Sequence, residues 1–401
     1  MTAAVPTTEP RSGATGRDAV VAGAVSWLAD RLRWFDPEQW ARHLRPKGFA
    51  PSALLELLII CRNLTAGHRG SPSVMHQDGS AGRRDGSATQ QDGPAARRDG
   101  PAGQSDGSAA RRDGSAGWRD GSAGWRDGSA AQRDGSAGRQ DGSAGCALRS
   151  AGAAGPAIDL AGRALDLAEE VVRRPGFGAG LHRGDAGFPH HVWLIALLAE
   201  AGRPVDPWPG VAQRLIDAGC AEPLGPGRSA AARLEAGYVF ELAGLRHGLP
   251  RMAELAADTA LGPGADPLLL TDADLYVITH MIFYLTDFGR RPLSPGGDVA
   301  RIRGLVEVLL GRQLAVGDLD LGAELLACAG ITGADPRLVA CAWERLAAAR
   351  RPDGSVPSPL FRQEALDRLS GEQAEAYEFG TCYHTTLATV LAATLTDGAH
   401  E

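Results

Sequence analysis

The sequence is poor in aromatic residues and has no apolar run long enough to cross a membrane. Aromatic residues make up 5% of the 401 residues, too few for an extended surface on which nucleic-acid bases could stack. The longest apolar run, Ala53–Cys61, is interrupted by Glu56 and is far shorter than the roughly 20 residues that a bilayer requires. No apolar block precedes Val20, so the N-terminus does not have the pattern of a signal peptide. We therefore expect no membrane partner.

Disulfide spacing, excess basic charge and nucleotide-binding motifs are also missing. The six cysteines lie far apart and lack the density of a disulfide scaffold, so we expect a cytoplasmic location. The formal net charge of −7 and the absence of a basic stripe argue against nucleic acid as a partner. Without a P-loop, a dinucleotide fingerprint or a nucleophile elbow, nucleotide hydrolysis and hydride transfer are disfavoured.

What the sequence does contain is a long segment of near-identical seven-residue units. Between positions 76 and 146 the dipeptide Asp-Gly recurs every seven residues, from Asp78 to Asp141. The units offer no apolar pair for a coiled coil, and each contains a glycine, which costs about 1 kcal/mol per helical site. Asp-Gly-Ser favours turns instead. We predict a disordered insert in a surface loop, where added length costs little closure entropy.

Outside the insert, apolar residues recur at helical spacing, and proline and glycine punctuate the pattern. No stretch alternates with a period of two, as a half-buried strand would. We predict an all-α protein with a disordered N-terminus (1–17), N-terminal helices (18–75) and, after the insert (76–146), a main helical domain (147–397). The predicted helices are 18–35, 51–63, 157–174, 189–201, 208–218, 229–247, 250–261, 272–288, 298–315, 319–329, 336–350 and 374–394.

Many helices joined by short loops fit a stack of helical hairpins. Arg351-Pro352-Asp353-Gly354-Ser355-Val356, directly after a predicted helix, resembles the Asp-Gly-Ser turns between hairpins of squalene cyclases and protein prenyltransferases. The segment 185–189 is similar, and it also precedes a predicted helix. Both families are α/α toroids, in which inner helices surround a central cavity. The resemblance implies an α/α toroid here, and an open α-solenoid is the alternative.

The segment Thr271–Gly289 holds the residues best suited to chemistry. Thr271 and Asp274 form a capping-box pattern at its start. One face of the helix is aliphatic, and the other is polar and aromatic without Lys, Arg or Glu, which suits a cavity wall better than solvent. His280 and Asp287 on this second face could share acid–base work or hold a metal. The alternative is a hydrogen-bonded histidine between packed helices, with Asp287 in the C-terminal turn. Further catalytic candidates on this face are Tyr276 and Tyr284.

A second candidate segment is Gly380–Thr386. Tyr383-His384-Thr385 resembles the segment that supplies a histidine zinc ligand in protein prenyltransferase β subunits, and lanthionine cyclases, which are also α/α toroids, likewise use cysteine and histidine ligands. The resemblance implies His384 as a zinc ligand and Cys382 as a possible second. His280, on the polar face of its helix, is a further metal-ligand candidate. The Asp-x-Cys pair of the prenyltransferases and the Cys-His-Gly triplet of the cyclases have no match here. The alternative is a buried small cysteine beside a hydrogen-bonded histidine.

Two further groups of polar residues lie on predicted helices. His190 and His191 occupy a helix start, where the helix dipole lowers histidine pKa values and keeps the rings neutral. We expect one of them, taken as His190, to face the same cavity. A polar stripe that we interpret as a solvated face consists of Glu235, Tyr238 and Glu241.

The segments around His190, His280 and His384 also resemble a group of uncharacterised actinobacterial all-helical proteins, over most of the chain outside the insert. We hypothesise a tailoring enzyme whose central cavity, lined by His, Asp and Tyr, takes a small apolar or peptidic substrate. The alternative hypothesis is a non-catalytic helical-repeat protein that binds a peptide or protein partner. Histidines gathered around one pocket would favour the enzyme, and scattered histidines would favour the binding protein.

Overall fold

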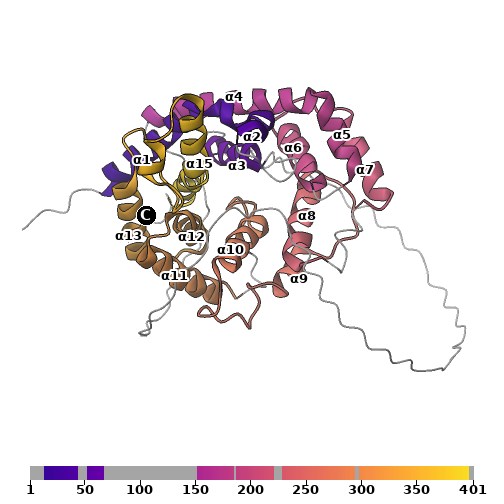
Figure 1. Ribbon diagram of the computed structural model, residues 1–401. Helices are drawn as coiled ribbons and strands as arrows, with labels where there is room; N and C mark the ends of the chain where they lie inside the picture. Colours follow the sequence, from indigo (N-terminus) through magenta and orange to yellow (C-terminus); the bar gives the residue numbers. More distant parts are fainter. Residues whose placement is uncertain are drawn as a thin grey trace, which may run out of the picture. The chain divides into compact units, whose positions relative to one another are not determined.

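The computed structural model describes residues 13–43, 52–66, 151–184, 187–220, 228–293 and 298–396 (Figure 1). Within these ranges all regular secondary structure is helical, which confirms the all-α prediction. None of the helices in these ranges is long and apolar enough to cross a membrane. The predicted insert, 76–146, lies outside the described residues. The helices are α1 (Gly13–Asp30), η1 (Leu32–Phe35), α2 (Pro37–His43), α3 (Ser52–Ala66), α4 (Ala151–Arg173), α5 (Pro175–Arg183), α6 (Phe188–Glu200), α7 (Trp208–Asp217), α8 (Ala230–Leu242), α9 (Met252–Ala257), α10 (Asp272–Leu285), α11 (Val299–Val316), α12 (Leu319–Thr332), α13 (Pro336–Ala349), α14 (Gln363–Leu366) and α15 (Gly371–Thr396).

Helix boundaries depart from the predicted ones mainly near the N-terminus and at short helices. The predicted helix 18–35 begins earlier, at Gly13, and gives way after Asp30 to the short 3-10 helix η1. The sequence pattern did not indicate α2 or α5, because an apolar period repeats too few times in 7 or 9 residues to be recognised. Both begin with proline, Pro37 and Pro175, at the first helical position, where its missing N–H leaves no hydrogen bond unmade.

α10 begins at the predicted capping box. The Thr271 hydroxyl accepts a hydrogen bond from the Asp274 N–H at 3.3 Å, and the Asp274 carboxylate accepts one from the Thr271 N–H at 2.8 Å. The helix ends at Leu285, before the predicted end at position 288. Asp287 and Phe288 then adopt left-handed backbone conformations, with φ of 49° and 54°, outside the right-handed helical range. The chain therefore leaves the helix before it reaches Asp287.

Six helices within the described ranges contact one another in order. α3 packs on α6, α6 on α8, α8 on α10, α10 on α12, α12 on α15, and α15 on α3. We call these the core helices. Each also packs against a second set, the cover helices: α3 on α4, α6 on α5, α8 and α10 on α9, α12 on α11 and α13, and α15 on α1.

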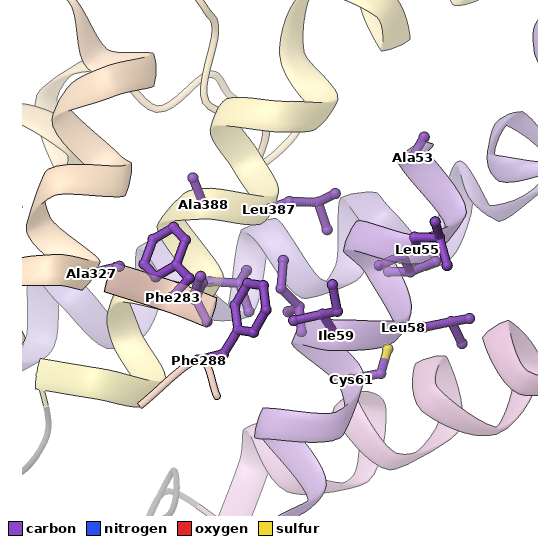
Figure 2. Packing of buried hydrophobic residues seen from close by; sticks show 14 of the residues in the cluster. Ala53, Leu55, Leu58, Ile59, Cys61, Phe283, Phe288, Ala327, Leu387 and Ala388 are labelled. Atoms are coloured by element: carbon purple, nitrogen blue, oxygen red, sulfur yellow. The ribbon is translucent and has the colours of Figure 1, made fainter. Parts of the chain in front are cut away.

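The apolar side chains between these helices form one continuous cluster. Figure 2 shows part of it, with Leu58 and Ile59 from α3, Phe283 from α10 and Leu387 from α15. The rings of Phe283 and Phe288 stack with 5.3 Å between their centroids. Each large apolar side chain contributes about 1.5–3 kcal/mol when it is fully buried. The cluster therefore joins helices that are far apart in the sequence.

The predicted Asp-Gly-Ser turn is present between α13 and α14. The Asp353 carboxylate accepts hydrogen bonds from the Ser355 N–H at 3.0 Å and from the Ser355 hydroxyl at 2.8 Å. Gly354 has a φ of 98°, and a Cβ at this position would overlap the carbonyl oxygen of Gly23 in α1. The turn is thus held against α1 at a separation that only glycine allows. The second predicted turn, 185–189, begins outside the described residues.

Replacing Gly354 with alanine should destabilise the protein by about 2 kcal/mol, because the new methyl group meets both a left-handed backbone conformation and the α1 backbone. Chemical denaturation measures this change. Gly162→Ala is the control: Gly162 lies inside α4, no atom is within 4 Å of the added methyl group, and helix propensity favours alanine by about 1 kcal/mol. Equal stability of Gly354→Ala and the wild type would contradict the close contact.

Candidate functional site

Polar residues from all six core helices form one group, which we call the polar cluster. Close contacts between histidine and carboxyl side chains join α12 to α15 and α10 within it, and another such contact joins α6 to α8. The charges of Glu235, Glu324 and Glu56 all raise the pKa of Tyr284, which connects the two sets. α3 is connected to the others through electrostatic effects on their pKa values. The members are Glu56 (α3), His190 (α6), Glu235 (α8), Tyr276, Thr279 and His280 (α10), Asp320 and Glu324 (α12), and His384 and Thr385 (α15).

His384 lies between two carboxylates of α12. Its Nδ1 is 2.9 Å from Asp320 Oδ1, and its Nε2 is 3.2 Å from Glu324 Oε1. Burial alone would lower the pKa of His384, but the negative charge of Asp320 and the hydrogen bonds to both carboxylates hold that pKa well above its usual value. Carboxylate oxygens only accept, so both ring nitrogens donate and the ring is an imidazolium cation.

Asp320 is held as a carboxylate by its neighbours in the polar cluster. The hydroxyl groups of Thr385 and Tyr276 donate to its carboxylate, the latter at 2.5 Å. Burial would raise the pKa of Asp320, but the charge of His384 and these hydrogen bonds lower it to about 2. The same contacts act in reverse on Tyr276, since burial and then the charges of Asp320 and Glu324 raise its pKa. Tyr276 is therefore a neutral hydrogen-bond donor.

His280 shares the carboxylate of Glu324 with His384. The Nδ1 of His280 is 2.7 Å from the carbonyl oxygen of Tyr276, one helical turn earlier, and 3.8 Å from Glu324 Oε2. Because a carbonyl oxygen only accepts, Nδ1 of His280 is the donor in this contact. Thr279 also donates to Glu324. The structure thus brings His280 and His384 together on one buried carboxylate.

Glu56 is a buried carboxyl group without hydrogen bonds. Both of its carboxyl oxygens are buried, and neither has a hydrogen-bond partner in the described part of the chain. Burial raises the pKa of Glu56 to about 8; His384 opposes this rise, and the negative charges of Glu324 and Asp320 add to it. Near neutral pH the side chain is therefore mostly a neutral carboxylic acid, which can donate a proton.

The two adjacent histidines of α6 have different surroundings. The Nε2 of His190 lies 3.5 Å from Glu235 Oε1 of α8, so His190 belongs to the polar cluster. His191 is fully buried, and its Nδ1 donates to the Gly187 carbonyl oxygen at 2.9 Å. The solvated stripe predicted on α8 is wrong for Tyr238, which is 2% exposed. Its neighbours on the core helices cover it, and the sequence of α8 alone does not show them.

The structure separates Asp287 from His280. Asp287 accepts two hydrogen bonds from the guanidinium of Arg62, at 2.6 and 3.0 Å, and one from the Tyr238 hydroxyl at 2.8 Å. Together with Glu200, Asp287 and Arg62 line a cavity of about 540 Å³ at the C-terminal ends of α3, α6, α8 and α10. The spacing of seven residues predicted a shared face. Because α10 ends at Leu285, Asp287 instead joins a bidentate ion pair away from the polar cluster.

Tyr284 lies beneath the polar cluster in an aromatic layer. Its ring stacks on Tyr238 with 5.2 Å between centroids, and its centroid is 6.0 Å from that of His280. Burial, followed by the charge of Glu235, raises the pKa of Tyr284 well above its usual value. Tyr284 therefore contributes a neutral, buried ring next to His280.

Cys382 and His384, the expected zinc ligands, have different neighbours. Cys382 is buried near Thr381, and burial raises the pKa of its thiol to about 11. Both ring nitrogens of His384 already face carboxylates. Within the described ranges, no group of three or more His, Cys, Asp and Glu side chains is arranged to hold a metal ion. Zinc binding by His384, Cys382 and His280 therefore stays a prediction.

Sequence reasoning missed three carboxyl groups of the polar cluster. Glu56 was noted only as the charge that interrupts an apolar run, although a lone charge on an otherwise buried helix is itself a signal. Asp320 and Glu324 are four residues apart, and both are buried on a helix that is apolar elsewhere. This spacing places them on one helix face and could have indicated a shared partner.

Glu56→Gln should make the free energy of unfolding depend less on pH than it does in the wild type. The pKa of Glu56 is about 8 in the folded protein against 4.5 as its reference value. Its stabilising contribution is therefore fully present below pH about 4.5 and is lost as the pH rises towards 8. As the pH rises between these limits, the variant should gain about 5 kcal/mol in free energy of unfolding relative to the wild type, measured by urea denaturation. Glu364→Gln, at an exposed position of α14, is the control, and a pH-independent difference for Glu56→Gln would contradict the assignment.

His384→Asn should lower the free energy of unfolding by about 3 kcal/mol at neutral pH, because Asp320 and Glu324 would remain buried without their cation. Denaturation of the purified variant measures this loss. Adding Asp320→Asn to the variant should recover part of the stability, since it removes one of the two uncompensated charges. The exposed His182→Asn is the control for histidine loss. Full stability of His384→Asn would show that the cation is not needed.

Comparison with known proteins gives a family without a described activity. No curated protein and no solved structure matches the chain. A family model does match, over residues 21–101 and 143–394, and its description is "Domain of unknown function (DUF6895)". The matched ranges contain every member of the polar cluster, and the unmatched residues between them lie within the seven-residue repeats. The chain belongs to the DUF6895 family.

Proposed function

We propose that this protein is an enzyme that performs acid–base chemistry at the polar cluster. The observation that carries the proposal is the contrast between two neighbouring carboxyl groups. The pKa of Glu56 is raised to about 8, whereas the pKa of Asp320 is lowered to about 2. Environments that push the pKa values of nearby groups apart are typical of sites that need an acid and a base at the same pH.

The proposed roles follow from the hydrogen bonds. Glu56, neutral near pH 7, is the general acid that donates a proton to the reacting group of the substrate. His280 is the general base: its Nδ1 donates to a backbone carbonyl oxygen, so Nε2 is the ring atom that would accept the proton. His384 supplies a positive charge held in place by Asp320 and Glu324, which stabilises negative charge in the transition state.

The order of helix contacts supports a toroid as the framework of this site. Each core helix packs on the next, and the last, α15, packs on the first, α3. An open solenoid would not bring its first and last repeats into contact. In a toroid, the inner faces of the core helices would surround a central cavity, and we propose that the polar cluster lines it.

The composition of the site favours a peptidic substrate over a small apolar one. Carboxyl, imidazole and hydroxyl groups dominate the polar cluster, and an apolar ligand would leave them without hydrogen bonds. The alternative, a non-catalytic helical-repeat protein that binds a peptide or protein partner, would use the same surface without proton transfer. A measurement of substrate turnover distinguishes the enzyme from the non-catalytic binding protein.

Wild-type protein incubated with a mixture of short peptides and low-molecular-weight metabolites should deplete at least one compound, followed by mass spectrometry. Glu56→Gln should slow this turnover by about 100-fold or more, because the variant has no acidic proton at that position. The wild-type kcat/KM should fall as the pH rises past about 8, where Glu56 ionises. Glu364→Gln, at an exposed position that is not part of the polar cluster, should keep the wild-type rate. Saturable binding without turnover, equal in all three proteins, would support the non-catalytic alternative.

A further inference from the structure

The polar cluster has two sides that differ in how their hydrogen bonds are satisfied. On α10, α12 and α15, the carboxylates of Asp320 and Glu324 accept from hydroxyl groups and from His384. On α3, α6 and α8, no hydrogen bond from a described residue reaches the carboxyl groups of Glu56 or Glu235. The carboxylates of the first side have hydrogen-bond donors, whereas the carboxyl groups of the second side have none among the described residues.

His190 belongs to the second side, and it also has a polar atom without a hydrogen-bond partner. Its Nε2 is buried and has no hydrogen-bond partner among the described residues, because its contact with Glu235 at 3.5 Å does not have hydrogen-bond geometry. A buried polar atom left unpaired costs about 1–3 kcal/mol. The unsatisfied atoms of Glu56 and His190 lie on neighbouring helices, and the partly exposed Glu235 carboxyl group is next to His190, so this side indicates a place where a ligand completes the hydrogen bonds.

The charged residues of the polar cluster indicate which class of ligand this side would bind. Within the described ranges, no arginine lies within ion-pair distance of the carboxyl groups of the polar cluster, and their cationic neighbours are histidines. His384 is already shared between Asp320 and Glu324. A cation is therefore favoured. An organic cation fits better than a metal ion, since no group of three or more metal-binding side chains is suitably arranged in the described part.

We propose that the side formed by α3, α6 and α8 binds the primary ammonium group of the substrate, with the Glu235 carboxylate as its ion-pair partner and Glu56 facing the adjacent carbonyl oxygen. This inference rests on the proposed function. A primary ammonium has three N–H donors and no acceptor, which suits carboxylate oxygens that accept nothing else. The Glu56 proton is then available to the carbonyl oxygen. A peptide with a free N-terminus carries both groups close together.

Two small probes test the proposal by isothermal titration calorimetry on the full chain. Alaninamide carries the ammonium and the carbonyl, and N-acetylalaninamide carries carbonyl groups without the cation. Alaninamide should bind about tenfold or more tightly than the acetylated probe, because a charge-assisted hydrogen bond is lost on acetylation. Equal affinities, or no saturable binding of alaninamide, would overturn the proposal. Binding of Mg²⁺ or Ca²⁺ in competition with alaninamide would overturn the choice of an organic cation.

A matched pair of variants locates the ion pair. Glu235→Gln should weaken alaninamide by about tenfold and leave the acetylated probe unchanged. Glu241→Gln, exposed on the same helix, should bind both probes like the wild type. Unchanged alaninamide affinity in a folded Glu235→Gln protein, checked by its melting temperature, would contradict the assignment. If Glu235→Gln does not weaken alaninamide binding but turnover still depends on Glu56, the ammonium site is contradicted and the proposed enzymatic function is not.

Discussion

The arrangement of the site depends on one interaction, the imidazolium of His384 held between two carboxylates of α12. Asp320 and Glu324 are both buried, and two buried negative charges would repel each other without a cation between them. The interaction also joins α15 to α12, two core helices that pack directly on each other. The negative charges left near Glu56 then help burial to keep that carboxyl group protonated.

This network divides the polar cluster into a rigid side and a receptive side. Hydroxyl groups of Thr279, Thr385 and Tyr276 complete the hydrogen bonds of the α12 carboxylates, so these side chains have little reason to move. Glu56 and Glu235 have no such donors among the described residues. A preorganised, satisfied network beside unsatisfied acceptors is the arrangement expected where a ligand is held next to a catalytic group.

Sequence reasoning identified the histidines of this site better than the carboxyl groups. His190, His280 and His384 were candidates because histidines on helical segments with few charges stand out. Glu56, Asp320 and Glu324 were missed, because an isolated acidic residue on a helix is usually solvated, and only the packing of α3 and α12 buries these carboxyl groups. Asp287 shows the opposite error. Its spacing from His280 is helical, but two left-handed residues after Leu285 redirect the chain to Arg62.

The sequence by itself determined the all-α class, the capping box of α10 and the Asp-Gly-Ser turn, because each depends on residues within one or two turns of chain. Only the tertiary structure decided which polar residues meet. Ion pairs such as His384 with Asp320 join residues 64 positions apart, and local periodicity holds no information about such pairs. The burial that raises the pKa of Glu56 likewise comes from neighbouring helices, so its chemical character is a property of the fold.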